Sequence, residues 1–237
     1  MPSSFIVFVS FCCAASAIYI VNDLADLTHD RQHPTKRMRP FARGAVPIEV
    51  GLAAVPFLLV ASLMLASIVN AAYIIVIYAA ISIIYSSSLK AYPLLDIFVL
   101  TFLYMCRLFG GGEATAHNVS LWLFAYAGFL FLSLALLKRV GELQSSANDA
   151  DVRISGRGYR PADLNLLLIM GVSSLFTSCL VLALYLQYEF SSQAKGNYSW
   201  GIVPLMLLWQ CRLWLATTRG EMNDDRSYTP RAMFIPG

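Results

Sequence analysis

The 237-residue chain is 58% apolar and only 13% charged, with a mean hydropathy of +0.63 and a formal net charge of +3. Soluble domains are nearer half apolar and a quarter charged, so this composition excludes an ordinary soluble globular protein. Apolar runs of about 20 residues, enough to cross ~30 Å of hydrocarbon, recur along the sequence and predict a polytopic membrane protein.

Seven transmembrane helices are expected, in a single all-α domain that covers residues 1–237. The first apolar run leads into charged residues rather than into a cleavage site, which indicates a membrane helix and no secretory signal. Basic residues gather in alternate connections and in the tail, and by the positive-inside rule these parts are cytoplasmic. The expected spans run roughly over 3–21, 48–69, 71–88, 93–112, 119–137, 163–187 and 199–218.

The connection after the first span, residues 22–47, reads NDLADLTHDRQHPTKRMRPFARGAVP. On a helix, Asp23, Asp26 and Asp30 fall within roughly 60° of one another, and Asn22 lies at the edge of that face. Three close carboxylates repel one another unless a cation lies among them, so we favour a site for Mg²⁺ that shares its ligands with a phosphate. The alternative is a solvated loop whose charges only mark the cytoplasmic side.

Basic residues follow these acids directly. Lys36, Arg37 and Arg39 provide the donors and positive charge that metal-bound phosphates need. Pro34 and Pro40 stiffen the turn that carries them. The acids and bases together therefore predict a site for a metal-bound phosphate.

Polar groups also occur within or at the ends of later spans. Asp96 begins the fourth span, and Arg107 follows three helical turns along the same side. A charged side chain within the membrane is costly unless it has a partner or a function. Asp96 and Arg107 are therefore expected to pair with groups on other helices, or Arg107 binds substrate. Tyr85, residues 86–88 and Lys90 close the third span, as a rim that faces phosphate or only as a helix end.

The fifth span ends in a second charged cluster. Lys138, Arg139 and Glu142 lie together at the expected membrane surface, and a polar connection of about 25 residues follows. One interpretation is a basic cluster attracted to anionic lipid. The other is a second half-site that faces the acidic motif. No convincing Ser/His/Asp set indicates a protein nucleophile.

Two motifs resemble a known family. NDLADLTHD at 22–30 resembles the NDxxDxxxD signature of the UbiA superfamily of membrane prenyltransferases, and RPFARG at 39–44 also matches that family. Within it, HPTKRMRP and KRVGEL most resemble the decaprenyl-phosphate phosphoribosyltransferase branch. The second acidic motif, DxxxD, of the aromatic prenyltransferases is replaced here by KRVGEL and a looser NDAD.

The resemblance implies a bundle of nine helices around a lipid-accessible cavity, so seven spans would leave the first and last family helices missing. It implies a Mg²⁺-dependent transfer of 5-phosphoribosyl from phosphoribosyl pyrophosphate to a polyprenyl (decaprenyl) phosphate, for cell-wall arabinan precursors. The alternatives are alkylation of an aromatic acceptor by a prenyl diphosphate, or an inactive truncated homologue. The expected location is the bacterial plasma membrane with a cytoplasmic active site. No nucleic-acid partner is expected, and oligomer formation stays open.

The resemblance also implies a role for each candidate residue. The metal ligands, which are also the catalytic residues, are Asp23, Asp26 and Asp30. The substrate-binding residues are Asn22, Lys36, Arg37, Arg39, Tyr85, Arg107, Lys138 and Arg139.

Overall fold

The computed structural model describes residues 2–32, 36–115, 119–146, 158–190 and 199–221, and within these ranges every regular element is a helix. The prediction of an all-α protein is confirmed. The long helices are α1 (Pro2–Ala25), α3 (Ile48–Ile68), α4 (Ala72–Ser87), α5 (Leu95–Ala114), α6 (Leu121–Ser146), α7 (Leu164–Phe190) and α8 (Ile202–Thr218). The short ones are α2 (Leu27–Gln32) and the 3-10 helices η1 (Lys36–Met38), η2 (Leu89–Ala91) and η3 (Pro161–Asp163).

Each predicted span corresponds to one long helix. Five of the described helices are long and apolar enough to cross a membrane, whereas α4 has 16 residues and α8 has 17. At 1.5 Å per residue these two reach about 24–26 Å, slightly less than the hydrocarbon thickness. The span predicted at 119–137 is too short, because α6 continues past its apolar run to Ser146.

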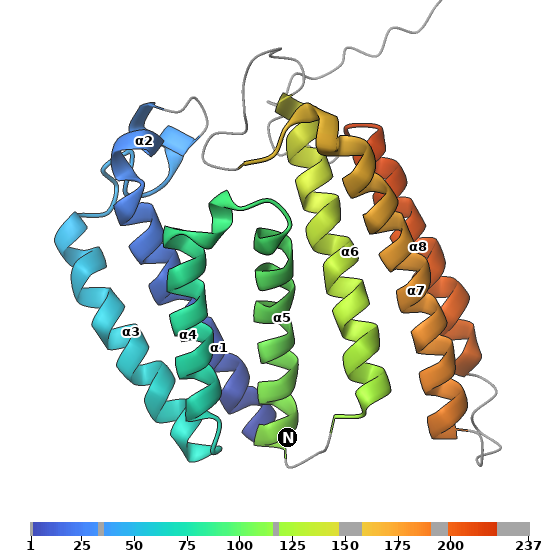
Figure 1. Cartoon of the computed structure of the whole chain (residues 1–237). Helices are drawn as coiled ribbons and strands as arrows, with labels where there is room; N and C mark the ends of the chain where they lie inside the picture. The colour runs from blue at the N-terminus through green and yellow to red at the C-terminus, as the bar shows by residue number, and fades with distance from the viewer. Residues whose placement is uncertain (1, 33–35, 116–118, 147–157, 191–198, 222–237) are drawn as a thin grey trace, which may run out of the picture.

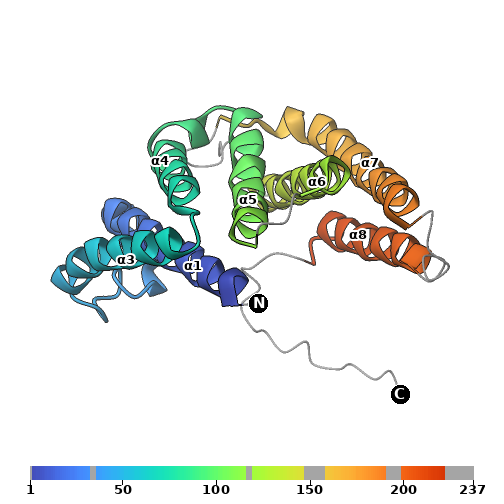
Figure 2. The same ribbon diagram turned by 90° about the horizontal axis from the view of Figure 1, so that it is seen from below.

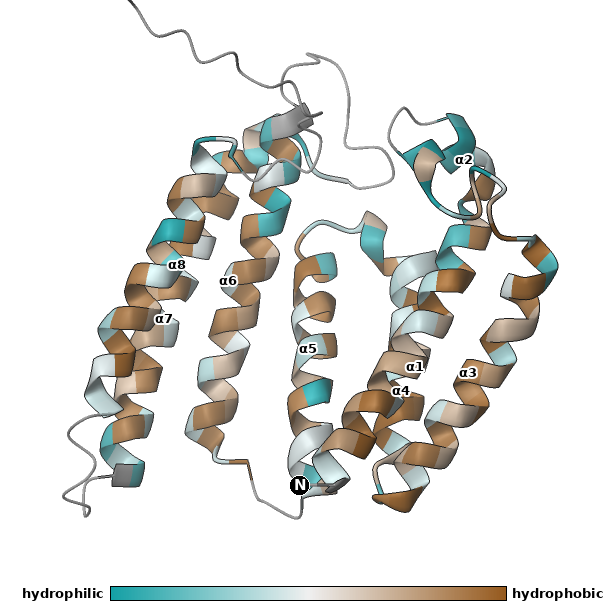
Figure 3. Ribbon diagram, turned by 180° about the vertical axis from the view of Figure 1, so that it is seen from behind, coloured by the Kyte–Doolittle hydropathy of each residue, from teal (hydrophilic) through white to brown (hydrophobic). Residues whose placement is uncertain are grey.

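The helices run alternately up and down, so one end of the bundle collects the polar connections (Figure 1). This end, here called the polar end, holds α2, η1, η2, the end of α6 and the start of α7. The N-terminus lies at the opposite end. In Figure 3, hydrophilic residues gather around α2 at the polar end, whereas hydrophobic residues dominate along the helices. Groups from distant parts of the sequence can therefore meet at the polar end.

Two buried clusters hold the bundle together, and α5 belongs to both. Seen from below, α1 packs along α3, α6 packs along α7, and α4 and α5 lie between the two pairs (Figure 2). Gly110 of α5 lets that helix approach α1, since a Cβ there would lie 2.7 Å from the Phe11 ring. The first cluster includes Val7, Phe11, Ile74, Tyr78 and Cys106, and the second includes Ile97, Leu136, Val140, Leu167 and Trp214. Because α5 contributes to both, its first turn at the polar end has a fixed place in the bundle.

Candidate functional site

A cavity of about 460 Å³ lies at the polar end and brings together residues that are far apart in the sequence. The acids come from α1, α2 and the turn between them, and the basic groups come from η1, the residue that follows it, η2 and α6. The lining residues are Tyr19, Asn22, Asp23, Asp26, His29, Asp30, Lys36, Arg39, Tyr85, Ser86, Lys90 and Lys138. The acidic motif and the second charged cluster therefore face one space.

The acids keep a helical spacing although α1 ends before the last two of them. The Asp26 amide donates to the Asn22 carbonyl and the Asp30 amide to the Asp26 carbonyl, each at 2.9 Å. The backbone thus continues with i→i+4 hydrogen bonds through the turn that joins α1 to α2. Asp23 and Asp30 are 8% and 3% exposed, and Asp26 is half-buried. All three carboxylates line the cavity, which is the arrangement that the helical spacing predicted.

Arg39 is the cation that the structure places between two of these acids. Its Nη1 donates to Asp23 Oδ1 at 2.9 Å and to Asp30 Oδ2 at 2.8 Å. The Arg39 side chain is 33% exposed, whereas the two carboxylate side chains are 10% and 4% exposed. One guanidinium nitrogen therefore joins two nearly buried carboxylates, and the repulsion expected between the acids is relieved by a residue of the chain itself.

A tight turn directs Arg39 back towards α1. The Arg43 amide donates to the Arg39 carbonyl at 3.0 Å, and Gly44 closes the turn with φ +74°. Phe41 is buried against α3, where a Cβ on Gly51 would lie only 2.8 Å from the Phe41 ring. This apolar contact anchors the turn and holds Arg39 over the acids.

The donor set suits a hard divalent cation, because carboxylate oxygens are the ligands that Mg²⁺ prefers. Over the residues that the structure describes, however, no group of three or more acidic, His or Cys side chains lies at a spacing that could hold a metal ion. The expected metal cluster is thus not assembled in this arrangement, in which Arg39 joins Asp23 to Asp30. The Arg39 guanidinium contacts one oxygen of Asp23 and one oxygen of Asp30, so a metal ion on those two oxygens would take its place.

Adjacent basic residues of the second charged cluster have different surroundings. Lys138 is exposed and lines the cavity. Arg139 is 1% exposed, and its Nη2 lies 2.7 Å from Asp96 Oδ2 while its Nη1 donates to Glu142. The structure therefore places Lys138 where the second half-site was expected, and Arg139 in a buried ion pair with α5. For Asp96, pairing with another helix is the alternative that the structure shows.

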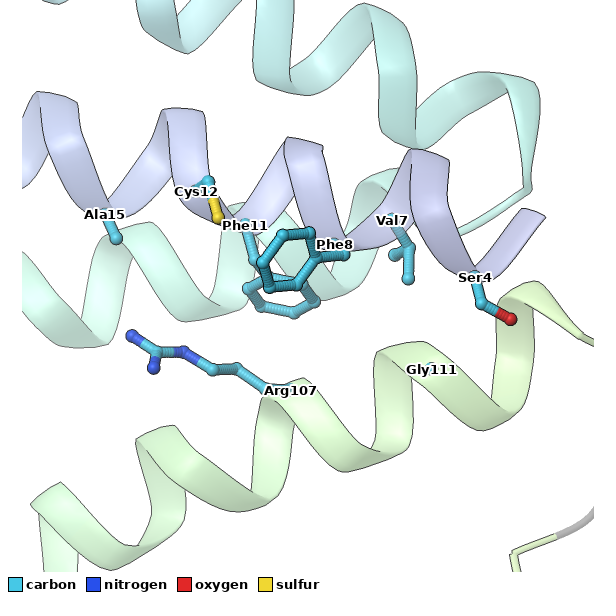
Figure 4. A pocket seen from close by; sticks show the side chains of 8 residues that line it. All are labelled: Ser4, Val7, Phe8, Phe11, Cys12, Ala15, Arg107 and Gly111. Atoms are coloured by element: carbon cyan, nitrogen blue, oxygen red, sulfur yellow. The ribbon is translucent and has the colours of Figure 1, made fainter. Parts of the chain in front are cut away.

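Two other expected phosphate ligands lie outside the cavity lining. Arg37 is exposed on η1. Arg107 lies about 18 Å along α5 from its first residue, donates to the Tyr78 hydroxyl at 2.8 Å, and lies 5.4 and 5.3 Å from the ring centroids of Tyr78 and Tyr104. Figure 4 shows it reaching towards α1 near Ala15, in a separate cavity of about 270 Å³.

The cavity also contains residues to which the sequence alone assigned no definite role. Lys90 from η2 joins Lys138, and Tyr19, His29 and Ser86 complete the lining. Tyr19 was not predicted from the sequence, although helical spacing could have identified it, since it precedes Asn22 by three residues and so shares its face. For Lys90, the sequence could not decide between a residue that faces phosphate and one that only ends a helix. Arg153 and Arg157 of the long connection lie outside the described residues.

Comparison with known proteins gives one family. Residues 2–235 match the UbiA prenyltransferase family. The chain is 34% identical over 227 residues to the nodulation protein NoeC of Azorhizobium caulinodans, a match covering 92% of this chain and 72% of that protein. It is 33% identical over 207 residues to the decaprenyl-phosphate phosphoribosyltransferase of Corynebacterium glutamicum, covering 85% and 62%. The chain spans between 43% and 72% of the length of the curated relatives it matches.

The fold matches a solved structure. A UbiA homolog from Archaeoglobus fulgidus, bound to DMAPP and Mg²⁺, superposes with a TM-score of 0.74 over 92% of this chain and 77% of that one, at 16% identity. The prediction of a UbiA-type helix bundle is confirmed. The family match and the five apolar helices together make the chain an integral membrane protein.

Proposed function

The chain belongs to the UbiA prenyltransferase family, and we propose that it is a Mg²⁺-dependent transferase that moves 5-phosphoribosyl from phosphoribosyl pyrophosphate to a polyprenyl phosphate. The product would serve the synthesis of cell-wall arabinan precursors, and the site would face the cytoplasm from a bacterial plasma membrane. The names of relatives at 33–37% identity, decaprenyl-phosphate phosphoribosyltransferases, support this choice. The chain shares less of its length with these relatives than with NoeC, so the substrates are part of the proposal.

The observation that carries the proposal is the composition of the polar-end cavity. Three carboxylates and four basic side chains line one space of about 460 Å³. The acids suit a metal that binds pyrophosphate, and the basic groups suit phosphates that the metal does not neutralise. These basic groups are Lys36, Arg39, Lys90 and Lys138.

Asp23, Asp26 and Asp30 would hold the metal, with the Asn22 amide beside them. When bound, Mg²⁺ supplies positive charge to the pyrophosphate as it leaves. Arg39 donates to two of these acids. With a metal ion held by those carboxylates, the Arg39 guanidinium would be available to donate to pyrophosphate oxygens.

Lys90 and Lys138 would receive the second phosphate-bearing substrate, the polyprenyl phosphate. An oxygen of that phosphate forms a bond to the ribose anomeric carbon, and the bond from this carbon to pyrophosphate breaks. The acceptor is already an anion, so no protein nucleophile or base is required. The work of these residues is to bring two negatively charged groups together and to stabilise the departing charge.

The number of cationic groups favours this reaction over prenyl transfer to an aromatic ring. An aromatic prenyltransferase must neutralise one diphosphate. Phosphoribosyl transfer involves a pyrophosphate, a 5-phosphate and the lipid phosphate. Lys90 and Lys138 come from η2 and α6, separate from the residues 36–39 beside the acids, as two phosphate-binding regions require.

Membranes that contain the protein, labelled phosphoribosyl pyrophosphate and polyprenyl phosphate test the proposal. The expected result is a labelled lipid that forms with Mg²⁺ and is lost when the metal is chelated. Prenylation of 4-hydroxybenzoate by a prenyl diphosphate, with no ribose phosphate in lipid, would favour the alternative reaction.

A further inference from the structure

A buried polar cluster adjoins the part of the cavity that carries Lys90 and Lys138. Asp96, in the first turn of α5, is 0% exposed, and its Oδ2 lies 2.7 Å from Arg139 Nη2. Its Oδ1 accepts a hydrogen bond from the hydroxyl of Tyr159, which is 1% exposed. The Arg139 guanidinium also lies 5.5 Å from the centroid of the Tyr159 ring. Burial of such groups is costly unless each is paired, so a cluster paired in this way fixes the segments that carry it.

Tyr159 connects this cluster to the linker between α4 and α5. Its hydroxyl accepts the Leu94 amide at 2.8 Å, and the Gly158 amide donates to the Ala91 carbonyl at 3.1 Å. Leu94 has φ +66°, a backbone conformation that L-residues rarely adopt and that surrounding contacts must support. A Cβ on Gly158 would lie 2.8 Å from the Ala91 oxygen, so only glycine fits this approach. The segment 158–159 thus holds the linker immediately after Lys90.

Arg139 connects the same cluster to α6. Successive residues on a helix point about 100° apart, so an inward Arg139 leaves Lys138 facing another direction. In the structure that direction is the cavity. The ion pair with Asp96 therefore sets the rotation of α6 that presents Lys138.

We propose that Asp96, Arg139 and Tyr159 form a clamp that positions Lys90 and Lys138 to bind a phosphate group. The proposal rests on the function proposed above and assigns these three as positioning residues, since they adjoin the cavity wall without lining it. Lys90 belongs to η2 and Lys138 belongs to α6. The buried contacts of the clamp join the linker that follows Lys90 to the helix that carries Lys138.

The surroundings of the Tyr159 hydroxyl favour its protonated form. Burial and the Asp96 carboxylate that accepts its hydrogen bond both raise the pKa of Tyr159 above its ordinary value. The hydroxyl therefore remains protonated throughout the physiological range and keeps donating to Asp96.

The variant Tyr159→Phe tests the clamp, because it keeps the buried ring and removes both hydrogen bonds of the hydroxyl. Binding of Mg²⁺-pyrophosphate and inorganic phosphate to the purified full chain in detergent is measured by calorimetry, and the KM for each substrate is measured alongside. We expect phosphate affinity to fall about three- to tenfold, less than complete loss of a charge-assisted contact would cause. The KM for the lipid phosphate should rise, while kcat per folded protein changes less than about twofold.

Ser133→Ala is the matched control. Ser133 Oγ accepts the Trp214 indole N–H at 3.0 Å and donates to the Gly171 carbonyl at 3.0 Å, so its loss also breaks two buried hydrogen bonds. It lies on α6 but away from the cavity. This variant should lower the melting temperature without changing phosphate affinity or KM.

A second variant disturbs the clamp from another direction. Gly158→Ala keeps the Tyr159 hydroxyl, but the added Cβ would lie 2.8 Å from the Ala91 oxygen and so displace the linker. The same rise in the KM for the lipid phosphate is therefore expected. Wild-type phosphate affinity in both variants would overturn the clamp. If the wild-type protein bound neither Mg²⁺-pyrophosphate nor phosphate, the proposed function would fail and the clamp with it.

Discussion

Replacement of Arg39 by Gln tests the claim that a guanidinium and a metal ion compete for the same carboxylates. Arg39 Nη1 donates to Asp23 at 2.9 Å and to Asp30 at 2.8 Å. The variant removes the cation and leaves two nearly buried carboxylates in place. It should therefore destabilise the metal-free protein and make it more responsive to divalent cations.

The structure gives the size of the effect. A hydrogen bond between charged groups contributes about 1.5–3 kcal/mol, but Arg39 is one-third exposed and water screens it. We therefore expect each bond to contribute less than this range, about 1 kcal/mol, which gives a loss of about 2 kcal/mol for the two bonds together. For a chain of this length, ~1 kcal/mol shifts the melting temperature by roughly 2–4 °C, so the expected decrease is about 4–8 °C.

Thermal unfolding in detergent, with EDTA and then with excess Mg²⁺, measures both effects. The Arg39→Gln variant should melt below wild type in EDTA and gain more from Mg²⁺ than wild type does. Arg37→Gln is the control, because Arg37 is exposed on the neighbouring η1 and has the same charge. Equal melting of wild type and Arg39→Gln in EDTA, or an equal gain from Mg²⁺, would show that Arg39 and the metal do not compete.

Three further outcomes are expected. Asp26→Asn keeps the side-chain shape but removes one charge from the metal ligands, so turnover should fall and the Mg²⁺ concentration for half-activity should rise; unchanged Mg²⁺ dependence would refute the metal assignment. Lys138→Ala should raise the KM for polyprenyl phosphate about tenfold or more, whereas Arg139→Ala should chiefly reduce the yield of folded protein, as size-exclusion chromatography would show. In a cysteine-free background, single cysteines at positions 36 and 115 should be labelled from opposite sides of the membrane, and labelling from one side would contradict the topology.

The sequence predicted most of the fold because the apolar runs are long and the charges lie between them. Every expected span is a helix, and the largest error in a boundary is at the end of α6. There Lys138, Arg139 and Glu142 interrupt the apolar pattern without interrupting the helix, since long charged side chains are good helix formers. Hydropathy marks the limits of the apolar run, and hydrogen bonding marks the limits of the helix.

The site was predicted less completely, because partners that are distant in the sequence decide which charged side chains face the cavity and which are buried in ion pairs. Lys138 and Arg139 are equivalent in sequence, and only Asp96, on another helix, shows that Arg139 faces inward. Local spacing likewise indicated that a cation lies among the acids. It did not indicate that the chain supplies this cation itself through Arg39, since the turn at Phe41 directs that side chain.

Mass spectrometry of the lipid product tests the central claim most directly. Purified protein in Mg²⁺ is given phosphoribosyl pyrophosphate, polyprenyl phosphate, a prenyl diphosphate and 4-hydroxybenzoate together, so that each reaction competes for one site. The account predicts a polyprenyl phosphate that has gained a phosphoribosyl group, absent in EDTA and strongly reduced in Asp26→Asn. A prenylated aromatic product, with polyprenyl phosphate recovered unchanged, would contradict it.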